Sequence, residues 1–222
     1  MMQRFARWHI WLGWLVGFPI LMWCVTGLIM VSRPIEEVRG DHLRAAQPTV
    51  STENIVLPRL YEPIRSAELV HQPDGQVWIV TGADGRKWRN SAVDGTRVPP
   101  VIEEEARRIA EAAYAGAGQI VSIAYLPAEA EPLELRRGLP SWQVRYSDGT
   151  NLYIDDNTGQ VAALRTPFWR VFDFVWGLHI MDLQTREDTH HPILIFFAII
   201  ASIGALIGCI LMFRRRKARV KA

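Results

Sequence analysis

The chain carries, at residues 190–213, the run HHPILIFFAIIASIGALIGCILMF, which has no formally charged residue and ends directly against RRRK at 214–217. A second uncharged run, IWLGWLVGFPILMWCVTGLIMVS, occupies residues 10–32. Each run reaches the roughly 20 apolar residues that a helix needs to cross a bilayer. The sequence therefore predicts a membrane protein with two transmembrane helices, one within residues 1–32 and one at 190–213, and its first partner is the lipid bilayer.

Each run is flanked by basic residues at the end that lies nearer to a chain terminus. Arg4 and Arg7 precede the first run, and the tail at 214–222 contains six further cations. Lys and Arg accumulate at the cytoplasmic ends of transmembrane helices. We therefore expect a multi-pass protein of the bacterial inner membrane, with both termini and the basic tail in the cytoplasm and the segment between the runs in the periplasm.

The first run is interpreted as a retained anchor, not as a cleaved signal peptide. Its apolar length exceeds that of a signal core, three Trp residues and Pro19 interrupt it, and no small-x-small cleavage site follows before Arg33.

The composition of the segment between the runs limits how it can be held together. Both cysteines, Cys24 and Cys209, lie inside the apolar runs, so this segment has no disulfide and depends on a hydrophobic core. The net charge of +2 reflects cations concentrated in the tail of a membrane helix, which argues against nucleic-acid binding.

The segment between the runs contains an internal repeat with a constant offset and no gap. In each copy an alternating strand with a Trp-x-Val core leads into an Asp-Gly turn and a second strand, a pattern typical of a β-hairpin. The matching pairs are Trp78 and Trp142, Val80 and Val144, Asp84 and Asp148, Gly85 and Gly149, and Gly95 and Gly159. We expect an α+β fold with two modules, at 33–99 and 100–166, each containing a small antiparallel meander.

A helix should precede the second meander, because three acidic residues at 103–105 suit a helix N-terminus and small apolar residues follow at helical spacing before Gly116. The counterpart at 55–65 contains Pro58 and Pro63 and should be short at best. The stretch at 127–140 is rich in Pro, Glu and Ala. We expect it to be an exposed loop.

Residues 168–183 have the pattern of an amphipathic helix. Phe168, Phe172, Val175 and their apolar neighbours fall on one face with His179 near its centre, while Arg170, Asp173 and Gly177 fall opposite. The segment is too short and too charged to span a bilayer. We expect residues 167–189 to form an interfacial helix and turn, with the apolar face toward the outer membrane surface.

These motifs together resemble a known family. The second repeat, through Tyr153-Ile154-Asp155-x-x-Thr158-Gly159-x-Val161, looks like a PepSY module. The first run, from His9-x-Trp11-Leu12-Gly13 through Trp23-x-x-Thr26-Gly27-Leu28, is similar to the opening helix of PepSY-associated transmembrane proteins, and Leu178-His179 with the closing run resembles their later helices. The larger members have four transmembrane helices where this chain has two.

The resemblance implies two classes of function. Some members are inner-membrane reductases in which histidines on helices hold b-type haem and pass electrons outward, often in iron acquisition. Other PepSY proteins act as protease-inhibiting or regulatory modules, so the module alone does not specify chemistry.

Four of the six histidines lie at or inside the membrane boundaries and are the candidate haem ligands. His9 lies at the cytoplasmic mouth of the first run and is either an interfacial residue or an axial ligand. His179 is either a core histidine satisfied by a backbone carbonyl, Asp173 or Asp182, or a haem or metal ligand. His190 and His191 lie at the outer end of the second run, as cap-region residues or as partners of His179.

Helix geometry separates these histidines into two sites. His9 and His190 stand at opposite ends of their runs, roughly 30 Å apart along the membrane normal at 1.5 Å per residue, so one iron cannot bind both. His9 would need a partner from another protein or from a second subunit, for example in a homodimer packed at Gly13 and Gly17. The other two histidines, His42 and His71, lack ligand spacing and are expected to be ordinary residues.

The chain has no recognisable NAD(P)H, flavin, phosphate or iron–sulfur motif. If it carries electrons, a separate membrane or periplasmic redox partner must deliver them. Two hypotheses follow from the sequence. The first is a b-type haem component for electron transfer or iron reduction, and the alternative is a haem-free, membrane-anchored binding or regulatory module.

Overall fold

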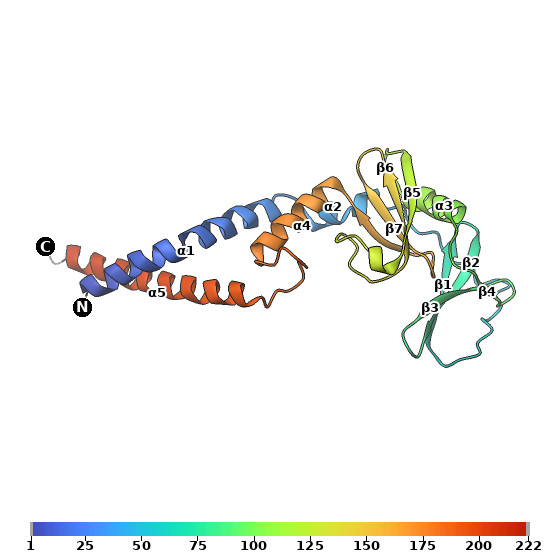
Figure 1. The fold of residues 1–222 in the computed structure, drawn as a ribbon, viewed down its shortest axis with the longest axis horizontal. Helices are drawn as coiled ribbons and strands as arrows, with labels where there is room; N and C mark the ends of the chain where they lie inside the picture. The colour runs from blue at the N-terminus through green and yellow to red at the C-terminus, as the bar shows by residue number, and fades with distance from the viewer. Residues whose placement is uncertain (1, 221–222) are drawn as a thin grey trace. The chain divides into compact units, whose positions relative to one another are not determined.

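The computed structural model describes residues 2–220, with the side chains of 3–213. The basic tail predicted at 214–222 lies outside the described side chains. The chain divides into two compact units, one formed by Met1–Pro34 with Val171–Ala222 and the other by Ile35–Arg170. The fold is α+β, with two long apolar helices at the ends of the chain and two antiparallel sheets between them in sequence (Figure 1).

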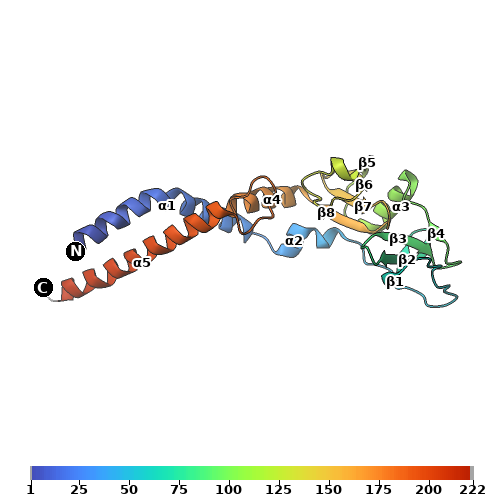
Figure 2. The same cartoon turned by 60° about the horizontal axis from the view of Figure 1, so that its bottom comes forward.

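The first unit is built on two long helices, α1 (Met2–Met30) and α5 (Pro192–Val220), which lie side by side (Figures 1 and 2). Within the described residues, Gln3–Met30 and Pro192–Phe213 are long and apolar enough to cross a membrane. Gly204 and Gly208 of α5 face Leu12 and His9 of α1. The missing side chains at these glycines let the two helices approach closely.

Helix α4 (Pro167–His179) confirms a helix in this segment, but the helix ends at His179 and not at Leu183 as predicted. Asp173 and Gly177, predicted to lie opposite the membrane-facing apolar side, are buried within the protein, while Val171 of the apolar side is half exposed. The reason is the loop that follows the helix. Arg186 of that loop forms an ion pair with Asp173 at 2.6 Å, and its Cγ lies 2.8 Å from the position that a Cβ on Gly177 would take.

The second unit contains two four-stranded meanders, which confirms the predicted repeat. The first sheet has the order β1 (Ile64–Gln72), β2 (Gly75–Gly82), β3 (Lys87–Ser91) and β4 (Arg97–Val98). The second has the order β5 (Ile120–Leu126), β6 (Ser141–Tyr146), β7 (Asn151–Asp155) and β8 (Val161–Arg165). All neighbouring strands are antiparallel.

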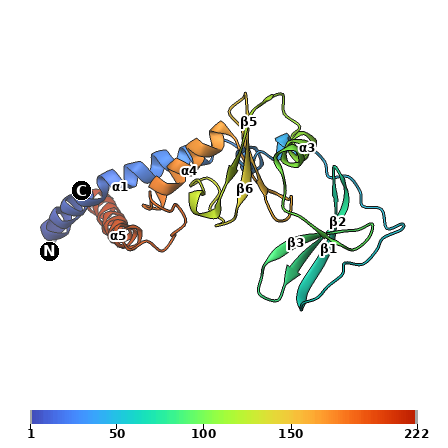
Figure 3. The ribbon, with the colours of Figure 1, turned by 45° about the vertical axis from the view of Figure 1, so that its right-hand side comes forward.

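The predicted helix is α3 (Glu103–Ala113), which packs against the second sheet (Figure 3). The acidic residues of its first turn interact favourably with the positive end of the helix dipole. Ala106, Ile109 and Ala110 form its buried stripe. These side chains share a core with Val144, Leu152, Ile154 and Leu164.

Residues 35–45 precede the first sheet in sequence but pack with the second. They form α2 (Ile35–Arg39) and a 3₁₀ turn, η1 (Asp41–Leu43). Arg44 makes an isolated β-bridge with Tyr114, and Leu43 packs against the core beneath α3. Residues 55–65 form no helix, as the two prolines suggested.

The segment at 127–140 is a loop with many exposed residues, as predicted, but its middle part is docked on the second sheet. It contains the short 3₁₀ helix η2 (Ala128–Ala130), and Leu135 is only 3% exposed in a cluster with Tyr153 and Ala163. The carboxylate of Glu134 accepts hydrogen bonds from Asn151 and from the hydroxyl of Tyr153. The many polar residues of this segment predicted exposure to solvent, but the carboxylate of Glu134 forms hydrogen bonds with groups on the sheet.

Candidate functional site

His9 of α1 is held by the backbone of α5. Its Nδ1 lies 3.1 Å from the carbonyl oxygen of Gly204, and its Cε1 lies 2.9 Å from where a Cβ on Gly208 would be. A carbonyl oxygen can only accept a hydrogen bond, so Nδ1 donates. In the neutral ring the lone pair is then on Nε2, which is the arrangement of a metal-ligating histidine.

His179, the last residue of α4, is also held by α1. Its Nδ1 lies 2.8 Å from Oγ1 of Thr26, and its backbone carbonyl accepts a hydrogen bond of 2.9 Å from Nε1 of Trp23. Neither Asp173 nor Asp182 is the partner, contrary to one sequence hypothesis. Asp173 pairs with Arg186, and Asp182 accepts hydrogen bonds within its own loop.

His190 and His191 lie directly before the first residue of α5, Pro192. His190 is exposed, its backbone N–H donates to Asp188, and its Nδ1 is 3.4 Å from the hydroxyl of Thr189. His191 is partly buried, and its Nδ1 has no hydrogen-bond partner among the described residues. An unpartnered buried nitrogen is costly unless another group satisfies it.

The four histidines do not form a common cluster. No hydrogen bond joins any two of them, and no group of three or more potential metal-ligating side chains occurs in the part of the chain that the structure describes. His9 and Thr26, the residue that holds His179, are separated by 17 positions on α1. At 1.5 Å per residue this is about 25 Å, which keeps the two rings in separate sites.

The loop that follows α4 is ordered by hydrogen bonds to Asp182. The carboxylate of Asp182 accepts from the Thr185 hydroxyl and from the backbone N–H groups of Gln184, Thr185, Glu187 and Asp188. The hydroxyl of Thr185 and these N–H groups hold the pKa of Asp182 well below its usual range. Trp176 adds a hydrogen bond of 3.0 Å to the carbonyl of Arg186.

Protonation of Asp182 should therefore loosen this loop. Because its folded pKa is lowered, its contribution to stability is complete above the unfolded value of about 3.9 and is lost as the pH falls below that value. Asp182→Asn should reduce hydrogen-exchange protection at 184–188 at pH 6, and the difference from the wild type should shrink near pH 3. A variant with full protection at pH 6 would contradict the role given to this carboxylate.

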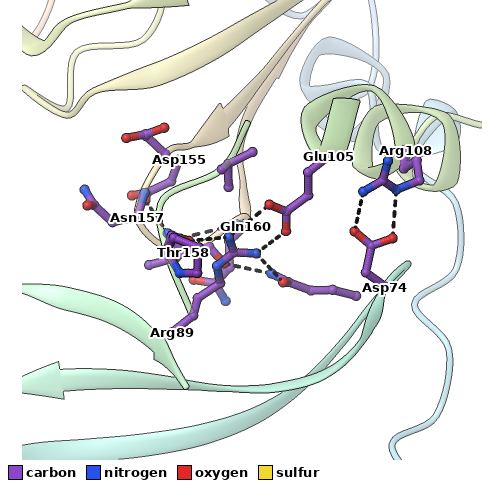
Figure 4. Close-up of polar contacts among 12 residues, drawn as sticks. Asp74, Arg89, Glu105, Arg108, Asp155, Asn157, Thr158 and Gln160 are labelled. Atoms are coloured by element: carbon purple, nitrogen blue, oxygen red, sulfur yellow. Dashed lines mark hydrogen bonds and ion pairs between the residues drawn. The ribbon is translucent and has the colours of Figure 1, made fainter. Parts of the chain in front are cut away.

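A second group of polar residues lies where the two sheets meet (Figure 4). Arg89 of β3, only 1% exposed, forms a two-pronged ion pair with Glu105 of α3 and donates to Gln72 at 2.8 Å and to the carbonyl of Pro99 at 3.0 Å. Gln72 in turn donates to the carbonyl of Thr158 at 2.7 Å. This cluster, Arg89 with Glu105, Gln72 and Thr158, joins the first sheet to α3 and to the β7–β8 turn.

The turn beside this cluster leaves no room for a side chain. Gly159 has a φ of 64°, and a Cβ there would lie 2.7 Å from Nε2 of Gln72 and 3.0 Å from Nη1 of Arg89. Glycine is therefore required both by the backbone and by the packing. A more exposed ion pair at the edge of the same interface joins Arg108 of α3 to Asp74 of the β1–β2 turn at 2.7 Å.

A cavity of about 1170 Å³ opens next to this interface within the second unit. Strands β1 and β8, each at the edge of its sheet, contribute to its wall. Val70 and Leu139 supply accessible apolar surface, and the cations Lys87, Arg97 and Arg137 also line it. Its volume is somewhat above the roughly 300–1,000 Å³ that is typical of small-molecule sites.

Comparison with protein families decides the membership of the chain. The profile of the PepSY-associated TM region matches residues 6–222. The chain belongs to the PepSY-associated TM region family. Neither the curated proteins nor the solved structures contain a match to it.

This PepSY-associated TM protein keeps its candidate histidines in place with residues that sequence reasoning missed. In the sequence Thr26 and Trp23 are only parts of an apolar motif, and no local pattern marks either of them as a partner of His179. A Gly-x-x-x-Gly spacing at 204–208 was visible in the sequence and could have indicated the face of α5 that meets α1. No local signal pairs Arg89 with Glu105.

Proposed function

We propose that this PepSY-associated TM protein carries b-type haem in the bacterial inner membrane and serves electron transfer or iron reduction. The supporting observation is that His9 and His179 each have Nδ1 at hydrogen-bond distance from a protein oxygen, on Gly204 and Thr26. That leaves Nε2 as the nitrogen available to a metal, the usual arrangement at haem iron. The bound iron, by changing between ferric and ferrous states, would supply single-electron transfer.

Each of the two histidines can supply one axial ligand to a haem iron. His9 and His179 belong to separate sites, so each needs a second ligand. For His179 this would be His190 or His191, of which His191 has an unsatisfied buried Nδ1. For His9 it would come from a second subunit or another protein. Gly13 and Gly17 have nothing within 4 Å of a Cβ built on them, so this side of α1 is open to another helix.

The protein would receive its electrons from a separate membrane or periplasmic redox partner. In the proposed orientation both termini are cytoplasmic and residues 35–170 are periplasmic, because cations flank the ends of the two spans that lie nearest the chain termini. Electrons would then pass from the His9 side toward the His179 side.

The orientation has a direct test. Alkaline phosphatase fused after Gly95 or after Gly159 should be active, because the enzyme folds only in the periplasm, and fusion after Arg216 should be inactive. The opposite pattern would overturn the orientation without touching the haem proposal.

A visible spectrum tests the haem proposal itself. Protein purified from haem-replete cells should show a Soret band and sharp reduced-minus-oxidised α and β bands. Protein with neither feature, prepared under conditions that load a known b-type cytochrome in the same cells, would overturn the proposal.

The second candidate function is a haem-free binding or regulatory module, and the 1170 Å³ cavity of the second unit favours it. The edge strands β1 and β8 in the cavity wall could accept an added strand from an extended peptide. In that case the two spans would act only as anchors. If the visible spectrum shows no haem bands, this second function replaces the first.

A further inference from the structure

The side chain of Thr26 makes three short contacts that together determine its hydrogen-bond roles. Its Oγ1 lies 2.7 Å from the carbonyl oxygen of Met22, 3.2 Å from that of Trp23 and 2.8 Å from Nδ1 of His179. Thr26 is 4% exposed, so water does not compete for these contacts. A hydroxyl has one proton to donate and two lone pairs that accept.

The single hydroxyl proton must point to the backbone of α1. The two carbonyl oxygens can only accept, and the bond to the residue four positions earlier is the usual one for a threonine within a helix. If the proton pointed to His179 instead, two oxygens would face each other at 2.7 Å with no proton between them. Oγ1 therefore accepts, and Nδ1 of His179 is the donor.

One further contact keeps His179 in this place. Trp23 donates a hydrogen bond to the backbone carbonyl of His179, and Gly27 lies near the ring, since a Cβ built on it would be 3.8 Å from Cε1. His179 is thus held at its backbone carbonyl and at Nδ1. No described residue forms a hydrogen bond with Nε2.

We propose that Thr26 is a positioning residue, whose hydroxyl fixes the Nδ1–H tautomer of His179 and leaves the Nε2 lone pair free to bind haem iron. This inference rests on the proposed haem function. Neutral imidazole in water favours the other tautomer, in which Nε2 carries the proton and cannot bind a metal. An oxygen that accepts from Nδ1–H reverses this preference and raises the basicity of Nε2.

The tautomer can be measured without haem. Full-length protein labelled with ¹⁵N-histidine in lipid nanodiscs, at a pH where the imidazole is neutral, should show Nδ1 protonated and Nε2 unprotonated at His179, with the signal assigned from a His179→Gln variant. Thr26→Ser keeps the hydroxyl and should retain this pattern. Thr26→Val keeps the shape without the acceptor and should move the proton to Nε2.

Two results would overturn the inference. One is an Nε2-protonated His179 in the wild type, a measurement that does not depend on any variant folding. The other is an unchanged tautomer in Thr26→Val.

Haem binding gives a second readout. Loss of an outer-sphere hydrogen bond typically weakens metal binding by about 10–100-fold, and Thr26→Val should lose affinity on this scale while Thr26→Ser should not. The haem that remains should have a higher reduction potential, because a less basic ligand stabilises ferric iron less. Equal affinity and potential in both variants would overturn the positioning role.

The outcomes separate the two proposals. If the wild type binds no haem but the tautomer changes as expected in Thr26→Val, the proposed function fails and the control of the ring by Thr26 stands. If haem binds and the tautomer does not respond, the function stands and the role of Thr26 fails.

Discussion

Replacing Arg89 by methionine should lower the unfolding free energy of the unit at 35–170 by about 3–5 kcal/mol, the usual cost of breaking a buried ion pair from one side. Arg89 is 1% exposed and holds Glu105, Gln72 and the carbonyl of Pro99 at once. Methionine fills much of the same volume but leaves the carboxylate of Glu105, largely buried, without its partner.

The measurement is urea unfolding of the full chain in detergent, followed by hydrogen exchange in peptides from β3 and α3. Arg86→Met is the matched control, because Arg86 is an exposed arginine of the turn between β2 and β3 whose ion pair with Asp84 lies in solvent, and the unfolding midpoint of this variant should not move measurably. Arg89→Met combined with Glu105→Leu should recover part of the loss, since no unpaired charge remains. A single variant as stable as the wild type would show that the cluster does not join the two sheets.

The sequence predicted those parts of the fold that depend on local patterning. The uncharged runs at 10–32 and 190–213 gave both long helices, and the repeated Trp-x-Val and Asp-Gly motifs gave two meanders, because strand alternation and turn chemistry act over a few residues. The acidic turn at 103–105 likewise marked the start of α3.

Features that depend on contacts distant in sequence were not predictable in this way. The burial of Asp173 depends on Arg186 in the loop that follows α4, so the helical wheel alone could not predict it. Glu134 attaches an apparently hydrophilic loop to the second sheet for the same reason. The hydroxyl partner of His179 comes from Thr26, 153 residues away.

The histidine variants carry the largest expected change in haem content. His179→Ala should abolish one haem signal while both spans still insert, because the ring would be a direct ligand and α1 and α5 retain their apolar length. Changing His190 and His191 together should give the same spectrum, since either could supply the second nitrogen at this site. His71→Ala, at an exposed histidine of β1, is the control and should keep the full haem content.

His9→Ala should act independently of these variants, because the two sites lie about 25 Å apart along α1. It should remove a different haem signal and leave the one that depends on His179. If His179 only hydrogen-bonds to Thr26, its alanine variant should instead keep all haem and lose about 1–3 kcal/mol of stability, the cost of an unsatisfied buried partner. Unchanged haem per protein in every variant would mean that all four histidines are structural, and that the open Nε2 atoms on α1 and α4 have no metal to bind.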